Sequence, residues 1–294
     1  MKKYLSHIDL ITLAVAAIGI LLRFWHLSVG EDSNGLYPAN HIAWVLLLIL
    51  SAGLLAALFL LAGYAGKSRS YRANFSPSLP GAVGYAIAGY AIAASSWLYL
   101  RSDRLPLYIL TGVLGLLAAA ALILGGWCRW KGKRPHFLVF ALPCVYFALR
   151  LFCIGHIWGD EPELHRYLLS FLANVMCVLA TYQLWAFSVS LGNRSKSLLY
   201  SLMGVYLCLV TVPGSSDGLF YLAIAIWLFT NLCPKTAAPF RPQLQTEPQE
   251  EPVPQAPAAP EEEIQAAPVS EPEADPDIDA IIAEFQRKID EMKE

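Results

Sequence analysis

The chain reads HIAWVLLLILSAGLLAALFLLAGY from residue 41 to residue 64, without one Asp, Glu, Lys or Arg. A helix that crosses a bilayer needs about 20 consecutive apolar residues, because the hydrocarbon core is about 30 Å thick. This stretch therefore predicts a transmembrane helix. Similar runs recur and predict an all-α polytopic membrane protein with about eight transmembrane helices, near residues 9–28, 41–64, 80–100, 106–127, 136–157, 166–190, 197–213 and 218–233.

The overall composition agrees with this fold class. Of the 294 residues, 56% are hydrophobic and 15% are charged, and the mean hydropathy is +0.47. Soluble domains are about 25% charged, so the apolar excess is too large for one soluble core. The composition excludes a soluble enzyme, a disulfide-stapled secreted domain and a nucleic-acid-binding protein.

The distribution of charge along the chain predicts the orientation of the spans. Lys and Arg gather in the loops at 67–72, 129–134 and 194–196, whereas alternate loops, such as the one at 159–163, are acidic or nearly neutral. The short loop at 101–104 is the exception. Because basic loops remain on the cytoplasmic side, we expect a multi-pass protein of the plasma (cell) membrane with both termini in the cytoplasm.

Three features of the spans leave alternatives open. The runs 197–213 and 218–233 are only about 16 residues long and fit either two short spans or a re-entrant hairpin. An arginine followed by histidine and acidic residues recurs in both halves, which raises the hypothesis of a parallel tandem duplication of four spans. Small residues at four-residue spacing, such as Gly84 and Ala88, favour close helix packing, either within the bundle or between two copies in a homo-oligomer.

Two arginines inside the apolar runs predict an outer site. Arg23 and Arg150 each lie about 21 Å above the inner end of their span, where a charge is costly unless it is paired, hydrated or able to reach the surface. Arg23 fits either a paired position or one that reaches the outer surface, whereas Arg150 is expected to point inward. An arginine fork binds carboxylates or phosphates. We therefore expect an outward-facing site for an anion or a lipid head group, formed by Arg23, His26, Arg150, His156, Asp160, Glu161 and His165.

Two other interpretations of this outer region remain. His156, Asp160 and His165 have side chains that suit a divalent metal, and an acidic solvated loop with arginine–carboxylate pairs at its base is the simpler alternative. No HExxH, GxSxG, GxGxxG or phosphate-binding loop occurs in the sequence. We therefore expect no cofactor and no catalytic residues, and an enzyme is the less favoured class.

The last 61 residues differ in composition from the bundle at 1–233. Residues 234–274 are rich in Pro and Glu and predict a disordered cytoplasmic linker. Asp275 and Pro276 then begin a predicted amphipathic helix over 275–294. Its apolar face needs a groove on a partner protein, or else the segment is a frayed tail. The partner-docking residues are expected to be Ile278, Ile281, Ile282, Phe285, Ile289 and Met292.

These features together favour one function and leave two alternatives. The favoured function is an integral membrane anchor or sensor with an outward-facing polar site, whose tethered helix recruits a cytoplasmic protein. The first alternative is a transporter of a small solute or anion, with Arg23 and Arg150 near its outer gate. The second is a membrane enzyme acting on lipid or envelope substrates. The bilayer itself and one cytoplasmic protein are the expected partners.

Overall fold

The computed structural model describes residues 7–29, 41–63, 69, 71–101, 106–160 and 164–237, and leaves out the side chains at 72–73, 156–160, 164–166 and 233–237. Helices are the only extended regular elements in these ranges. Residues 238–274 of the predicted linker and the predicted docking helix at 275–294 lie outside the described residues. The following account therefore concerns the helical bundle alone.

The predicted spans coincide with helices to within a few residues. Local chemistry explains several boundaries: the His41 ring accepts a hydrogen bond from the Ala43 amide at 3.3 Å, Asn193 accepts from the amides of Ser195 and Lys196, and Gly132 follows the end of a helix with a φ of +64°. The helices are α2 (Ile8–Ser28), α3 (Ile42–Ala62), α4 (Tyr71–Asn74), α5 (Leu79–Arg101), α6 (Pro106–Trp130), α7 (Leu138–Asp160), α8 (Leu164–Ser188), α9 (Arg194–Thr211) and α10 (Gly218–Ala237).

Six of these helices are long and apolar enough to cross a membrane, namely α2, α3, α5, α6, α7 and α8. They carry large apolar side chains on their outer surfaces, as a lipid-facing surface requires. Examples are Leu21, Phe59, Leu60, Leu98 and Leu124, each more than half exposed. The chain is therefore a multi-pass helical membrane protein.

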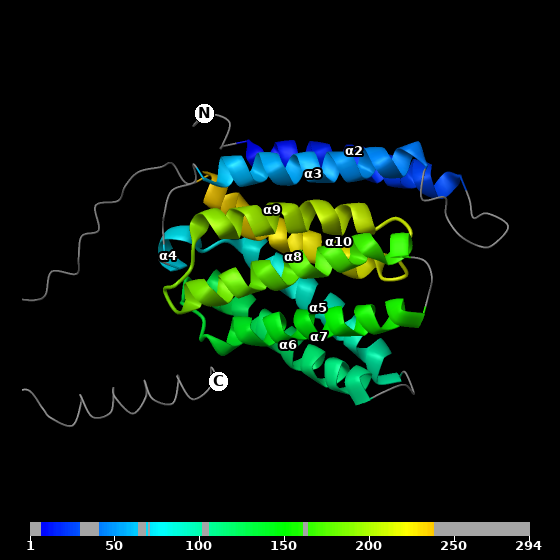
Figure 1. Ribbon diagram of the computed structural model, residues 1–294. Coiled ribbons are helices and arrows are strands. Elements are labelled where there is room, and N and C mark those ends of the chain that lie inside the picture. The colour runs from blue at the N-terminus through cyan, green and yellow to red at the C-terminus, as the bar shows by residue number, and fades with distance from the viewer. Residues whose placement is uncertain are drawn as a thin grey trace, which may run out of the picture. The chain divides into compact units, whose positions relative to one another are not determined.

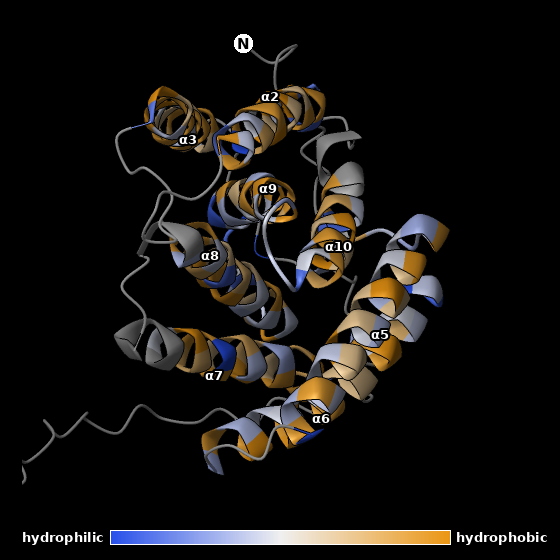
Figure 2. Cartoon of the chain, turned by 90° about the vertical axis from the view of Figure 1, so that its right-hand side faces the viewer, coloured by the Kyte–Doolittle hydropathy of each residue, from blue (hydrophilic) through white to orange (hydrophobic). Residues whose placement is uncertain are grey.

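The helices lie side by side along a common direction, and their connections alternate between two ends (Figure 1). Viewed along that direction, α2 and α3 form a pair on one side and α5 and α6 a pair on the other, with α9 between them (Figure 2). We name one end of the bundle the basic end, after its Lys- and Arg-rich connections. The helices α3, α6 and α8 end there, and the helices α2 and α7 end at the opposite end.

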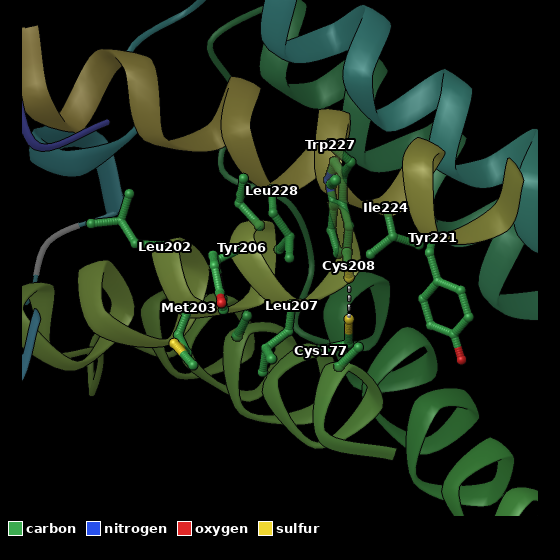
Figure 3. Close-up of a cluster of buried hydrophobic side chains, with 14 of the residues drawn as sticks. Cys177, Leu202, Met203, Tyr206, Leu207, Cys208, Tyr221, Ile224, Trp227 and Leu228 are labelled. Atoms are coloured by element: carbon green, nitrogen blue, oxygen red, sulfur yellow. Dashed lines mark hydrogen bonds between the residues drawn. The ribbon is translucent and has the colours of Figure 1, made fainter. Parts of the chain in front are cut away.

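α9 is the central helix of the bundle. It packs against α2, α3, α8 and α10, and every residue from Ser201 to Cys208 is buried. Figure 3 shows Cys208 of α9 next to Cys177 of α8, with the two sulfurs 3.8 Å apart. Tyr206 points to another side of α9, where its hydroxyl lies 2.8 Å from that of Ser51 in α3. Because α9 contacts protein instead of lipid, it does not need the continuous apolar surface of a lipid-facing span. This location explains its weak hydropathy signal.

Small residues serve packing between helices of the same bundle. Gly84 of α5 faces Thr230 of α10, and Gly89 of α5 faces Ile123 of α6 at 2.9 Å from an ideal Cβ position. These contacts match the packing alternative for the small-residue stripes. The predicted homo-oligomer stays a prediction.

The two halves of the bundle are arranged differently. Helices α7, α8, α9 and α10 pack against one another in chain order, whereas in the first half α2 packs with α3 and α5 with α6, and α3 and α5 form no comparable pair. A tandem duplication would place equivalent helices in equivalent neighbourhoods. The packing therefore gives no support to the duplication hypothesis.

Candidate functional site

Arg150 lies inside the bundle and is almost fully buried, with 1% of its surface exposed. Its Nη2 atom donates to Asp217 at 2.5 Å, and its Nη1 atom donates to Ser95 at 2.7 Å. α7 supplies the arginine, α5 the serine, and the connection before α10 the carboxylate. The inward position expected for Arg150 is the one that the structure has.

Aromatic rings surround the Arg150 guanidinium. Its Cζ atom lies 3.9 Å from the ring centre of Phe220, 5.7 Å from Tyr99 and 5.9 Å from Tyr221. Such rings attract a cation through their negative faces and exclude water from it. Tyr221 in turn accepts a hydrogen bond from Asn174 of α8 at 2.8 Å. The Arg150 cluster, defined by these contacts, therefore joins α5, α7, α8 and α10.

The Arg150 cluster is chemically almost saturated. Two of the guanidinium nitrogens have partners, and only Nε is buried without a hydrogen bond. Asp217 is 36% exposed, so its carboxylate also faces outward. An anionic ligand would have to displace this carboxylate in order to reach Arg150. The arrangement favours a structural role, in which the ion pair holds helices together, over an open anion-binding site.

Arg23 belongs to a second cluster, between α2 and α3. Its Nη1 atom lies 3.3 Å from Nδ1 of His26, and its Cζ atom lies 5.5 Å from the ring centre of Trp44. Because a guanidinium can only donate, the histidine nitrogen is the acceptor of this contact. The His41 ring, which caps α3, lies 6.0 Å from His26. Arg23 and His26, both predicted site residues, are therefore brought together.

The predicted single outer site is only partly described. Arg23 joins α2 to α3, whereas Arg150 joins α7 to α5 and α10, on the other side of α9 (Figure 2). The described side chains thus form two clusters. His156 and Asp160 fall in the last turns of α7 and His165 in the first turn of α8, but their side chains lie outside the description, as does all of Glu161. Among described residues, no three His, Cys, Asp or Glu gather as metal ligands.

A third buried arginine is Arg129, which the sequence places in the basic loop at 129–134. The structure places it in the last turn of α6, 1% exposed, where Nη1 donates to Asn231 of α10 at 3.2 Å. Its Cζ atom lies 5.1 Å from the ring centre of Phe75. Its Nε and Nη2 atoms are buried without hydrogen bonds. A third buried guanidinium therefore lies at the basic end of the bundle.

Hydroxyl groups around Arg129 also lack partners. Those of Tyr71, Ser78 and Tyr85 are buried without a hydrogen bond. Burial raises the pKa of Tyr71 to about 12, although the nearby Arg129 opposes the shift, so the phenol keeps its proton at neutral pH. The Arg129 cluster, defined by these residues with Asn231 and Phe75, therefore holds several buried polar atoms without hydrogen-bond partners.

Asp217 and Arg129 are cluster residues that sequence reasoning missed. One signal was available for Asp217, because it is the only acidic residue between Glu163 and Glu247. A lone carboxylate among apolar spans is the natural partner of an intramembrane arginine. For Arg129 no sequence signal separates a loop arginine from one that turns back into the bundle.

No family model, curated protein or solved structure matches the chain. Its class therefore rests on the six apolar helices and their packing, which define a multi-pass helical membrane protein.

Proposed function

We propose that this chain is an integral membrane anchor of the plasma membrane, with eight spanning helices, both termini in the cytoplasm, and residues 275–294 recruiting a cytoplasmic protein. The single observation that carries the proposal is the filled centre of the bundle. Where a transport path would run, residues 201–208 of α9 are buried without interruption. Close packing of this kind supports a rigid anchor over a carrier that must open a path.

The extent of α9 supports two short spans over a re-entrant hairpin. At its start, the Ser195 hydroxyl donates to the Ala62 carbonyl at the end of α3. Beyond its end, Gly214 approaches Leu27 at the end of α2, with an ideal Cβ position 2.8 Å from the leucine side chain. Because α2 and α3 run in opposite directions, these contacts lie at opposite ends of the bundle. α9 therefore runs the full width, about 27 Å for 18 residues.

α10 crosses the same width in the opposite direction. Asp217, just before its start, pairs with Arg150, and Asn231 near its end accepts from Arg129. α9 can span without the hydropathy of the other helices, since its neighbours are protein, and α10 is itself an apolar helix. With eight spans, the basic loops face one side together with both termini, which the excess of Lys and Arg assigns to the cytoplasm.

Polar side chains of α8 form hydrogen bonds within the bundle. Asn174 donates to Ser170 and Tyr221, and Thr181 donates to backbone carbonyls one turn earlier. Gln183 accepts from the Asn193 amide. Such hydrogen bonds hold helices together in lipid. We further propose that Arg23 and His26 belong to an outward-facing site, at which the anchor binds an anion and so acts as a sensor.

Recruitment is tested with the full chain in native membranes. Ile281→Glu combined with Phe285→Glu places two carboxylates on the apolar face of the predicted docking helix. We expect the co-purifying cytoplasmic protein to fall at least tenfold while membrane insertion is unchanged, because burial of two charges opposes docking.

The matched control is Ala280→Glu combined with Ala283→Glu, which adds the same two carboxylates on the opposite face. Quantitative mass spectrometry of cross-linked membranes measures the recruited protein in each variant. Equal recruitment by the two double variants would reject the docking assignment.

A further inference from the structure

A pocket of about 600 Å³ opens at the basic end of the bundle, between the last turns of α8 and the start of α9. It includes the connection between these helices, where Gln183 accepts a hydrogen bond from the Asn193 amide at 3.2 Å and Asn193 caps α9. Buried Gln183 therefore holds the pocket wall in place. The charged, polar and aromatic side chains that line the pocket are Arg69, Tyr182, Gln183, Trp185, Asn193 and Lys196.

Two exposed cations line this pocket without a counter-charge. Arg69 and Lys196 both line it, and both side chains are exposed. The sequence also contains no Asp or Glu from residue 33 to 102 or from 164 to 216. The segments that supply both cations therefore hold no carboxylate to neutralise them. Two cations on one pocket favour an anionic ligand.

The remaining lining is aromatic and apolar. The rings of Tyr182 and Trp185 lie 5.8 Å apart in an edge-to-face arrangement, and the Trp185 Nε1 atom is buried without a hydrogen bond. Val189 and Leu191 add apolar surface, and Leu191 is 73% exposed. From Tyr182 to Val189 the lining follows α8 for about 10 Å. This length is comparable with the distance from the lipid head groups to the first part of the acyl chains.

We propose that this pocket binds the phosphate of an anionic phospholipid from the cytoplasmic leaflet. Arg69 and Lys196 neutralise the phosphate, the indole N–H of Trp185 donates to a lipid oxygen, and the apolar wall accommodates the beginning of the acyl chains. Basic pockets between helices on the cytoplasmic side are the usual sites for such head groups. The inference goes beyond the anchor proposal, because it does not involve residues 275–294.

The test uses the full chain purified in detergent and titrated with phosphatidylglycerol, with bound lipid counted by native mass spectrometry. We expect Arg69→Gln combined with Lys196→Gln to weaken phosphatidylglycerol binding about 10- to 30-fold, since two basic contacts are lost. Phosphatidylcholine, which is uncharged overall, should bind the native chain and this variant equally. Trp185→Phe should weaken phosphatidylglycerol binding a few-fold by removing only the N–H donor.

The control is Lys131→Gln combined with Lys133→Gln, which removes two cations from the same end of the bundle but outside the pocket. Retained phosphatidylglycerol binding in this control, together with its loss in the pocket variant, supports the proposal. Equal loss in both double variants would reduce the effect to general surface charge and overturn the proposal. Displacement of the lipid by inorganic phosphate at physiological concentration would assign the pocket to free phosphate and overturn the lipid assignment.

Discussion

Two buried arginines hold opposite ends of α10 in different ways. Arg150 meets the carboxylate of Asp217 and a nearly complete ring of aromatic side chains. Arg129 meets only the Asn231 amide and Phe75, and two of its nitrogens stay without partners. Both arginines are 1% exposed, so burial alone does not explain the difference.

The positions of the two arginines along their helices explain it. Arg129 lies in the last turn of α6, where the negative end of the helix dipole partly compensates a cation. Arg150 lies about ten residues before the end of α7, where the dipole gives no such compensation, since it acts only within the last turn. A guanidinium deep in a helix therefore requires a carboxylate, and one at a helix end tolerates an amide.

The largest expected effect comes from Asp217→Asn, which makes the start of α10 resemble its other end. The substitution leaves the Arg150 charge buried without compensation, and we expect a loss of about 3 kcal/mol in the free energy of unfolding. Thermal unfolding in detergent measures the loss. The control is the double variant Arg150→Met with Asp217→Asn, which removes both charges and should recover most of the stability. A double variant as unstable as the single one would contradict the charge argument.

A smaller effect is expected from Gly81→Ala beside Arg129. A Cβ there would lie 2.6 Å from the Ser78 hydroxyl and 3.1 Å from the Arg129 Nε atom, so the serine hydroxyl would have to shift and the arginine would have to move by a few tenths of an ångström. We expect a loss of about 1–2 kcal/mol. Gly53→Ala in α3 is the matched control, because its Cβ meets nothing within 4 Å, and it should leave the unfolding midpoint unchanged or slightly raised. If both variants behave alike, Arg129 does not depend on the space at Gly81.

The smallest effect is expected from Asn231→Asp, which gives Arg129 the carboxylate that Arg150 already has. The new pair should add about 0.5–1 kcal/mol at neutral pH, because the gain is reduced by the loss of the Asn231 hydrogen bond to the Trp227 carbonyl. The gain should disappear in acid, where the carboxyl binds a proton. A destabilised variant at neutral pH would mean that the helix dipole already compensates Arg129 fully.

The sequence predicted where each helix begins and ends far better than which side chains and helices pack against it. Continuous apolar runs depend only on the thickness of the bilayer, so α3 could be located to within two residues of its ends. The inward position of Arg150 followed from its depth in the span. Its partner Asp217 did not, because 67 residues separate the two side chains and helix packing alone brings them together.

The amino-acid sequence by itself determined that this is a multi-pass helical protein, because apolar length and the cost of unpaired backbone groups in lipid leave few other solutions. Only the tertiary structure decided that α9 occupies the centre, and that three arginines lie in separate clusters. In lipid no hydrophobic force selects which helices pack together. That choice depends on side-chain shape and on specific polar pairs, which hydropathy does not record.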